Sequence, residues 1–305
     1  MKQILVTGAY GFLGRYVANE FKKAGNYVVG IGHGKWDKDE YSKWGIDDWY
    51  ETTITFESLL NINKRFDIII HCGGSGSVGF SYENPYEDFQ KSVQSTLSIL
   101  EYIRLQNIEC KFIYPSSPAV QGNLGSVQIM EDMVATPVSP YGFHKKIAEE
   151  ICFSYHNNFK IDVGVVRFFS IYGKGLQKQL LWDACKKINR SNEVVFFGTG
   201  NETRDWIHVS DAASLLYKFS QNLEGYVVIN GGTGIKTSIN EIVNYLCSYM
   251  NKSTLVKFNG VVKEGDPLHF WANIEKANKL GWKPDVAVQE GLKDYVNFFK
   301  SINND

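Results

Sequence analysis

Short apolar runs alternate with amphipathic segments through the first half of the chain. The apolar runs lie at residues 4–6, 27–31, 67–71, 111–115 and 161–168. A run without polar alternation is typical of a parallel strand that is covered on both faces. Between the runs, apolar residues recur at helical spacing over 15–24, 86–106 and 141–157. The pattern predicts an α/β fold built on a doubly wound parallel sheet.

The alternation becomes irregular after residue 168. Further patterned segments are helical ones at 180–188, 239–250 and 288–300 and a strand at 226–230. We therefore predict a first domain over residues 1–168, completed by a returning strand near 226–230, and a smaller mixed lobe over 169–305. Segments 36–50 and 123–140 are expected to be irregular, the first with a short helix at most. The crevice between the two parts is the expected ligand site.

The first apolar run ends in a glycine-rich turn, T-G-A-Y-G-F-L-G. Closely spaced glycines let the backbone turn sharply and bring main-chain N–H groups close to a pyrophosphate. The helix that follows offers unpaired donors and a partial positive charge to an anion. The turn predicts a dinucleotide site, although similar turns also occur without a ligand. The expected contacts are Thr7, Gly8, Tyr10, Gly11, Phe12, Leu13 and Gly14.

The end of the second strand bears on which dinucleotide is bound. An acid at this place usually binds the adenosine ribose, whereas the chain has no acid before Asp37. The gap leaves room for a 2'-phosphate, with His33, Lys35 and Arg15 as candidate partners. We expect NADP(H) in preference to NAD(H), the alternative being that these are ordinary loop residues.

Two more strand ends carry side chains toward the same edge of the sheet. Cys72, Gly73 and Gly74 end the third strand with another close backbone approach, and His71 before them either meets the chemistry or bonds only to its neighbours. The fourth strand delivers Ser117 to the carboxyl edge, where open α/β sheets bind their ligands.

Tyr141 and Lys145 lie at i and i+4, on one face of a predicted helix. The ammonium is expected to lower the pKa of the phenol, so that Tyr141 exchanges protons near neutral pH. With Ser117 holding a substrate oxygen and a nicotinamide exchanging hydride, the three side chains predict alcohol and ketone chemistry. The alternative is a core tyrosine beside a solvated lysine.

Composition excludes several other classes of function. The net charge is −1 and the pI is near 6.6, so no basic field exists to hold nucleic acid or an anionic membrane. Five cysteines lie far apart, which argues against a disulfide framework and for a reducing compartment. No apolar run approaches a membrane span, and the absence of a charged and apolar leader pattern before the first strand leads us to expect no targeting segment. We expect a cytoplasmic protein without a metal site.

The motifs together resemble the extended short-chain dehydrogenase/reductase family, in its NAD(P)-dependent epimerase/dehydratase branch that acts on nucleotide sugars. The resemblance implies a Rossmann-like sheet with a C-terminal substrate lobe and extends over nearly the whole chain. The matching motifs are T-G-x-x-G-F-L-G at 7–14, D-I-I-I-H-C-G-G at 67–74, S-x-x-V-x-G at 117–122, Y-x-x-x-K at 141–145, R-F-F-S-I-Y-G at 167–173, G-T-G-x-x-x-R-D-W-I-H-V at 198–209 and L-G-W-K-P at 280–284.

By this resemblance Ser117, Tyr141 and Lys145 are the catalytic residues. The implied substrate contacts are Ser75, Ser117, Ser170, Gln179, Arg204 and Lys263, the last two facing the nucleotide phosphates. The chain departs from the family at Gln121, where a tyrosine is usual, and at Ser92, where an asparagine is common. Sugar dehydratases carry Asp-Glu after the catalytic hydroxyl, and Pro118-Ala119 at this place argues against dehydration.

Three functions remain after these exclusions. The leading prediction is NADPH-dependent reduction of a 4-keto nucleotide sugar, because the acid at the second strand is missing. The alternative is a nucleotide-sugar 4-epimerase with a retained NAD, and the third is a non-catalytic dinucleotide sensor. The family also implies a homodimer formed through the fourth and fifth sheet helices, over 86–106 and 141–157. The apolar positions of the helix over 86–106 are compatible with either pairing or burial.

Overall fold

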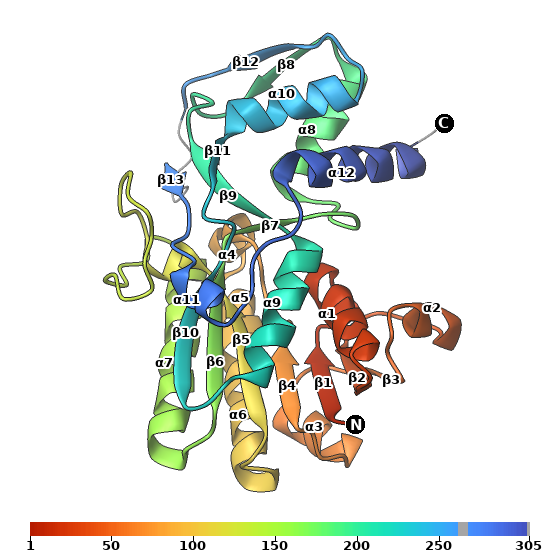
Figure 1. Ribbon diagram of the computed structural model, residues 1–305, viewed down its shortest axis with the longest axis vertical. Coiled ribbons are helices and arrows are strands. Elements are labelled where there is room, and N and C mark those ends of the chain that lie inside the picture. Colours follow the sequence, from red (N-terminus) through yellow and green to blue (C-terminus); the bar gives the residue numbers. More distant parts are fainter. Residues whose placement is uncertain (262–267, 304–305) are drawn as a thin grey trace.

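Seven parallel strands form one sheet across the lower part of the molecule (Figure 1). The computed structural model describes residues 1–261 and 268–303. Every neighbouring pair in this sheet is parallel, and β10 returns from the second half of the chain to pair with β6. The order across the sheet is β10 (Tyr226–Gly231), β6 (Val163–Phe168), β5 (Lys111–Ser116), β4 (Ile68–His71), β1 (Gln3–Thr7), β2 (Tyr27–Gly32) and β3 (Asp48–Glu51).

Helices cover both faces of this sheet, so the fold is the predicted Rossmann-like α/β arrangement. One apolar cluster joins the sheet to α1 (Phe12–Lys23), α9 (Val209–Gln221) and α11 (Glu275–Lys279). A second cluster joins its other face to α3 (Phe56–Ile62), α6 (Ser95–Gln106) and α7 (Pro140–Phe159). The central strands are buried on both sides, which explains their uninterrupted apolar sequences.

A smaller lobe stands above the carboxyl edge of the sheet (Figure 1). A third apolar cluster unites its helices α8 (Gln179–Arg190), α10 (Ile239–Tyr249) and α12 (Val288–Asn303). Its short strands are β7 (Ser170–Tyr172), β8 (Glu193–Phe196), β9 (Thr203–His208), β11 (Lys236–Ser238), β12 (Leu255–Phe258) and β13 (His269–Phe270). The domain boundary at residue 168 stays a prediction. Three elements that follow residue 168 in the sequence, α9, α11 and β10, belong with the large sheet.

Two segments differ from the sequence prediction. Residues 36–50 contain α2 (Lys38–Lys43) and most of β3, an edge strand that is only half-buried and therefore lacks an apolar run. The single helix predicted over 86–106 is α5 (Pro85–Phe89), a π-helical turn η1 (Gln90–Gln94) and α6 in succession. The structure also contains the short helices α4 (Val78–Glu83) and η2 (Pro118–Val120).

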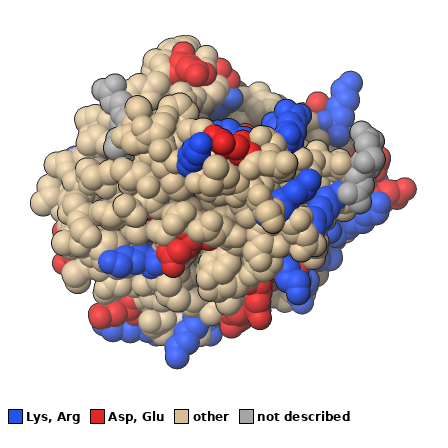
Figure 2. All heavy atoms as spheres, turned by 90° about the horizontal axis from the view of Figure 1, so that it is seen from above, with Lys and Arg blue, Asp and Glu red and all other residues tan. Residues whose placement is uncertain are grey.

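Charged side chains of both signs are interspersed on the face seen from above (Figure 2). This mixture agrees with the net charge of −1. Among the helices of the described residues, none combines the length and the apolar character needed to cross a membrane.

Candidate active site

The glycine turn between β1 and α1 approaches other backbone segments closely. Gly8 has a φ of +65°, and a Cβ atom there would lie 2.6 Å from the backbone nitrogen of Gly73. A Cβ atom at Gly14 would lie 2.3 Å from the carbonyl oxygen of Gly8, so α1 packs tightly on its strand. No side chain caps α1 at Gly11. The first N–H groups of α1 are therefore available to an anion, and the turn fits the pyrophosphate of a dinucleotide.

Gly8→Ala is expected to remove dinucleotide binding and to destabilise the protein. The new Cβ atom would collide with the Gly73 backbone, in addition to the left-handed conformation that costs about 1–2 kcal/mol for an L-residue. Gly25→Ala is the matched control, because Gly25 has a φ of +80° and nothing within 4 Å of its added Cβ. Denaturant unfolding and the dinucleotide content of the purified variants measure both effects. Equal losses in the two variants would contradict the close approach at Gly8.

A cavity of about 980 Å³ lies between the sheet and the upper lobe. Its volume is at the upper end of the range for ligand pockets. Gly11, Phe12 and Leu13 line it from the glycine turn. The other predicted site residues on its wall are Cys72, Gly73, Gly74, Ser75, Ser117, Tyr141, Lys145, Ser170, Gln179 and Arg204. The dinucleotide turn and the three predicted catalytic side chains thus share one cavity.

Ser117, Tyr141 and Lys145 converge from the end of β5 and the first turns of α7. Ser139 caps α7 by accepting a hydrogen bond from the Gly142 N–H, and Pro140 occupies the first helical position. Ser117 lines the cavity beside Tyr141, and its hydroxyl oxygen accepts a hydrogen bond from the Ala119 N–H at 3.2 Å. The Lys145 ammonium lies 5.9 Å from the centre of the Tyr141 ring. A hydroxyl, a phenol and an amine therefore line the same cavity.

The pKa values of this group are set mainly by burial. Burial raises the pKa of Tyr141 to about 12, and the hydrogen bond with Ser117 acts in the opposite direction. Burial lowers the pKa of Lys145 to about 8. The expectation that Lys145 brings the phenol pKa close to neutrality is wrong for this arrangement, because burial of the phenol raises that pKa. The Lys145 ammonium itself donates to the Pro115 carbonyl at 3.0 Å.

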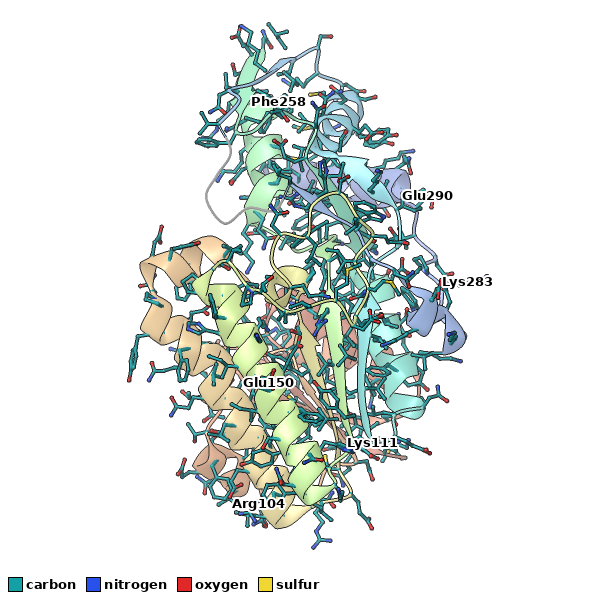
Figure 3. All side chains as sticks on the ribbon, turned by 90° about the vertical axis from the view of Figure 1, so that its left-hand side faces the viewer. Arg104, Lys111, Glu150, Phe258, Lys283 and Glu290 are labelled. Atoms are coloured by element: carbon teal, nitrogen blue, oxygen red, sulfur yellow. The ribbon has the colours of Figure 1, made fainter. Side chains whose placement is uncertain are left out.

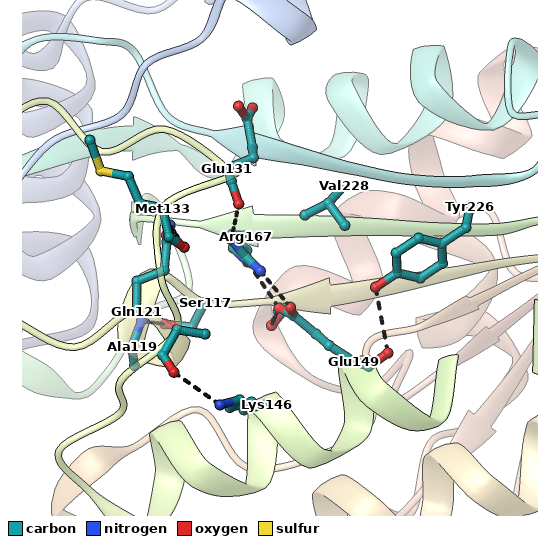
Figure 4. A network of polar contacts seen from close by, with 12 residues as sticks. Ser117, Ala119, Gln121, Glu131, Met133, Lys146, Glu149, Arg167, Tyr226 and Val228 are labelled. Atoms are coloured by element: carbon teal, nitrogen blue, oxygen red, sulfur yellow. Dashed lines mark hydrogen bonds and ion pairs between the residues drawn. The ribbon is translucent and has the colours of Figure 1, made fainter. Parts of the chain in front are cut away.

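A buried charge network behind the catalytic side chains was not predicted from the sequence. Arg167 of β6 donates from Nε and Nη2 to Glu149 of α7 at 3.1 and 2.7 Å, and from Nη1 to the Glu131 carbonyl at 2.8 Å (Figure 4). Ser116 donates to the same Glu149 carboxylate at 2.6 Å. The network fixes the residue next to Ser117 and anchors the 123–140 loop. The sequence feature that could have indicated this network is Glu149, which lies four residues after Lys145 on the same helix face.

The residues predicted to select NADP lie outside the cavity. His33 and Lys35 are exposed and absent from its wall. Arg15 donates to the carbonyl oxygens of Tyr10 and Gly11, at 2.5 and 3.3 Å. Its guanidinium also packs against the rings of Tyr10, Trp36 and Trp44. These contacts give the predicted preference for NADP no support.

His71 and Thr7 form a buried pair at the start of the site. The imidazole Nδ1 lies 2.7 Å from the Thr7 hydroxyl, and Nε2 lies 3.0 Å from the Ser95 hydroxyl. Burial lowers the pKa of His71 to about 3, so it stays neutral. Both ring nitrogens of His71 thus have partners among its neighbours, while the residue also lines the cavity.

Residues 4–231 match the family described as NAD dependent epimerase/dehydratase family. The chain belongs to this family. It is an enzyme of the extended short-chain dehydrogenase/reductase type, as the motifs predicted. It is 31% identical to the UDP-glucuronate 4-epimerase of Thermodesulfobacterium geofontis over 316 residues, with 98% of this chain and 97% of that protein covered.

Solved structures of epimerases share the fold over almost their full length. The Thermotoga maritima UDP-glucose 4-epimerase with UDP-glucose superposes with a TM-score of 0.89 at 25% identity, covering 98% of this chain and 99% of the other. The Bacillus cereus UDP-glucuronic acid 4-epimerase with UDP-glucuronic acid and NAD gives 0.86 at 27% identity, with the same two coverages. This epimerase/dehydratase family member thus has both the sequence motifs and the complete fold of sugar-nucleotide enzymes.

The substrate contacts that the family implies are distributed over both walls of the cavity. Ser75 and Ser170 line it, and Gln179 spans it by donating to the Gly76 carbonyl at 3.2 Å. Arg204 also lines the cavity, with its Nη1 donating to the Thr203 carbonyl at 3.0 Å. Lys263 lies outside the described residues.

Gln121, which replaces the usual tyrosine of this family, faces away from the cavity. Its side chain is fully buried and donates to the carbonyl oxygens of Met130 and Met133, at 2.6 and 3.3 Å. Gln121 is absent from the cavity wall. The Gln121 side chain therefore anchors the 123–140 loop, and a glutamine at this position leaves the catalytic side chains in place.

Proposed function

We propose that the protein is a nucleotide-sugar 4-epimerase that acts on a UDP-hexose or UDP-hexuronate and retains a tightly bound NAD. The observation that carries the proposal is the shared cavity of Ser117, Tyr141, Lys145 and the glycine turn. Similarity to UDP-sugar 4-epimerases over nearly the full chain favours epimerisation over the predicted 4-ketoreductase.

The bound dinucleotide would supply a reversible acceptor for the hydride on C4 of the sugar. We expect Ser117 to hold the C4 oxygen by a hydrogen bond, because its side chain lines the cavity together with Tyr141. Tyr141, once deprotonated, would take the C4 hydroxyl proton as the alcohol is oxidised and return it when the other face of the ketone is reduced. The positive charges of Lys145 and of a bound oxidised NAD would lower the phenol pKa from the value that burial gives it.

NAD in preference to NADP is part of this proposal. Structures of similar proteins were solved with NAD and a UDP-sugar together. Arg15, the third candidate for a 2'-phosphate beside His33 and Lys35, is already bonded to two backbone carbonyls. Chromatography of the dinucleotide released from denatured protein is expected to give NAD, and NADP in its place would contradict this part.

Incubation with UDP-glucuronate or UDP-glucose, without added dinucleotide, tests the reaction itself. Proton NMR is expected to show the 4-epimer appearing until equilibrium. The predicted reductase would instead leave these sugars unchanged and oxidise added NADPH in step with a 4-keto sugar. The second strand ends at Gly32 without the acidic residue that usually binds the ribose of NAD. This absence is the observation that favours the reductase as a second candidate. A sensor would convert neither class of substrate.

We also propose a homodimer that pairs α5, α6 and α7 with the same helices of a second copy. Figure 3 shows this face, with Glu150 on α7 and Arg104 on α6. Large apolar side chains are exposed along it, namely Phe89, Leu97, Phe143, Ile147 and Phe153. Their positions on adjacent helices match the four-helix pairing that the family implies.

Phe143→Asp is expected to raise the dimer dissociation constant at least about 30-fold, the effect of losing one interface hot spot of 2 kcal/mol. The phenyl ring is 51% exposed in the single chain, so the fold itself should tolerate the change. Ile235→Asp is the control, because Ile235 is also exposed but lies on the upper lobe. Sedimentation equilibrium measures both. A monomeric wild type, or a dimeric Phe143→Asp variant, would contradict the assignment.

A further inference from the structure

A loop of the upper lobe forms part of the cavity wall. Residues 173–179, called here the 173–179 strap, run from the end of β7 to the first position of α8. Leu176, Lys178 and Gln179 line the same cavity as the glycine turn between β1 and α1. Leu176 is buried in the third apolar cluster, and the buried Tyr295 phenol of α12 donates to its carbonyl at 2.6 Å. The middle of the strap therefore belongs to the core of the upper lobe.

The first half of the strap is bonded to α1, the helix that follows the glycine turn. The Tyr16 phenol donates to the Lys174 carbonyl at 2.9 Å. The Tyr16 ring packs against the rings of Phe12 and Trp44, with centres 6.0 and 5.2 Å apart, so the phenol is held in place for this bond. Phe12 also lies against the strap, because a Cβ atom on Gly175 would lie 3.6 Å from its ring. One end of the strap is therefore fastened two residues beyond the glycine turn.

The second half of the strap is bonded to the segment that follows β4. The Gln179 amide donates to the Gly76 carbonyl at 3.2 Å. Gln179 has a φ of +65°, in the left-handed region that side chains other than Asn and Asp rarely adopt. Such a conformation persists where the surrounding structure holds it, and it is a recurrent feature of ligand clamps. Gly76 lies two residues beyond Gly74, so this bond fastens the strap next to the glycines at the end of β4.

Two hydrogen bonds thus join the upper lobe to the sheet domain at this cavity. The partners of the strap, Tyr16 and Gly76, each follow one of the two glycine segments that approach one another at Gly8 and Gly73. These segments are the part of the sheet domain that fits a dinucleotide. The strap would have to leave both partners before the lobe could separate from the sheet domain here.

We propose that Tyr16 and Gln179 are positioning residues that retain the dinucleotide by fastening the 173–179 strap to the sheet domain. The proposal rests on the proposed epimerase, since that reaction requires the reduced dinucleotide to stay bound until the keto sugar has rotated and been reduced. A 4-ketoreductase instead exchanges its dinucleotide in each cycle. Both bonds link two parts of the chain, so they slow release without being contacts to the dinucleotide.

Exchange of the co-purified dinucleotide for a radiolabelled one, without sugar, tests this retention in the intact holoenzyme. Tyr16→Phe removes one bond. Gln179→Asn removes the other, since asparagine tolerates the same backbone conformation but its amide is one methylene shorter. We expect about fivefold faster exchange in each variant, the effect of one hydrogen bond, and about 25-fold in the double variant, because the two bonds share no partner. Without sugar, any substrate contact of Gln179 does not enter the measurement.

Tyr102→Phe and Gln128→Asn are the matched controls. The Tyr102 phenol donates to the Lys64 carbonyl at 2.6 Å, and the Gln128 amide donates to the Ala272 carbonyl at 2.9 Å. Both bonds resemble those of the strap, but neither side chain belongs to the described cavity wall. Both controls should exchange the dinucleotide at the wild-type rate. A merely structural tie would lower the melting temperature of the strap variants and leave their exchange unchanged, and that result would overturn the proposal.

Turnover gives a second signature of the strap. During epimerisation the double variant should lose reduced dinucleotide and slow with time, and added NAD should restore its rate, whereas the wild type should need no NAD. Slow exchange by the wild type and fast exchange by the double variant, in a protein that epimerises no sugar, would support the strap and refute the proposed function. An active wild-type epimerase that exchanges its dinucleotide as fast as the double variant would refute the strap alone.

Discussion

Tyr141→Phe is expected to lower kcat about 10²- to 10⁴-fold, the usual contribution of a general acid and base. In the proposed mechanism the phenol oxygen of Tyr141 takes the C4 proton and returns it, whereas Ser117 and Lys145 do not exchange this proton. Removing that oxygen leaves the fold in place, because the ring is part of the buried α7 surface and the Tyr141 N–H bonds to Ser81. Steady-state rates with a UDP-sugar measure the loss.

The control for this substitution is Tyr155→Phe on the same helix. Tyr155 donates to Glu101, away from the cavity wall, so its phenol has no part in the proposed reaction. Tyr155→Phe should retain wild-type kcat, while Tyr141→Phe should retain bound dinucleotide and a cooperative unfolding transition. Turnover by Tyr141→Phe within a few fold of wild type would remove Tyr141 from the mechanism.

Arg167→Met is expected to lower the free energy of unfolding by about 3–5 kcal/mol, because it leaves Glu149 buried without its cation. Both side chains of the pair are only 8% exposed. Met preserves much of the side-chain volume, so the loss reports on charge more than on packing. The variant also frees the Glu131 carbonyl, and with it one anchor of the 123–140 loop.

Lys257→Met is the matched control for the buried pair. Lys257 and Glu193 form an ion pair of similar length on β12 and β8, but their side chains are 52% and 51% exposed. Exposed pairs contribute about 0–1 kcal/mol, so urea unfolding should barely change. A similar small change in Arg167→Met would mean that the buried network does not hold the site together.

Much of the fold could be predicted because its strands are covered on both faces. Runs such as Ile68–His71 have no polar alternation, and the glycine turn marks the first strand end without ambiguity. The strand β3 was not predicted, because this edge strand with the sequence D-W-Y-E is half-buried and has no apolar run. The π-helical turn of η1 was also missed, because helical spacing continues through Gln90–Gln94 with little disturbance.

The candidate site was predictable where its chemistry is carried by local spacing. Tyr141 and Lys145 share a helix face, and Ser117 follows a strand, so their meeting at one cavity follows from topology. The pKa of Tyr141 was not predictable, since it depends on burial and on where the Lys145 ammonium bonds. The contact between Asp88 and His144 was not predictable either, because these residues are 56 positions apart in the sequence and meet only when α5 packs on α7.

The most direct test of the central claim uses a UDP-sugar that carries deuterium at C4. A hydride that leaves C4 and returns to the same carbon through a retained dinucleotide must keep its label, so NMR should find full deuterium at C4 of the epimer in ordinary water. Loss of that deuterium to solvent, or product formation only with added NADPH, would contradict epimerisation by the Ser117, Tyr141 and Lys145 site.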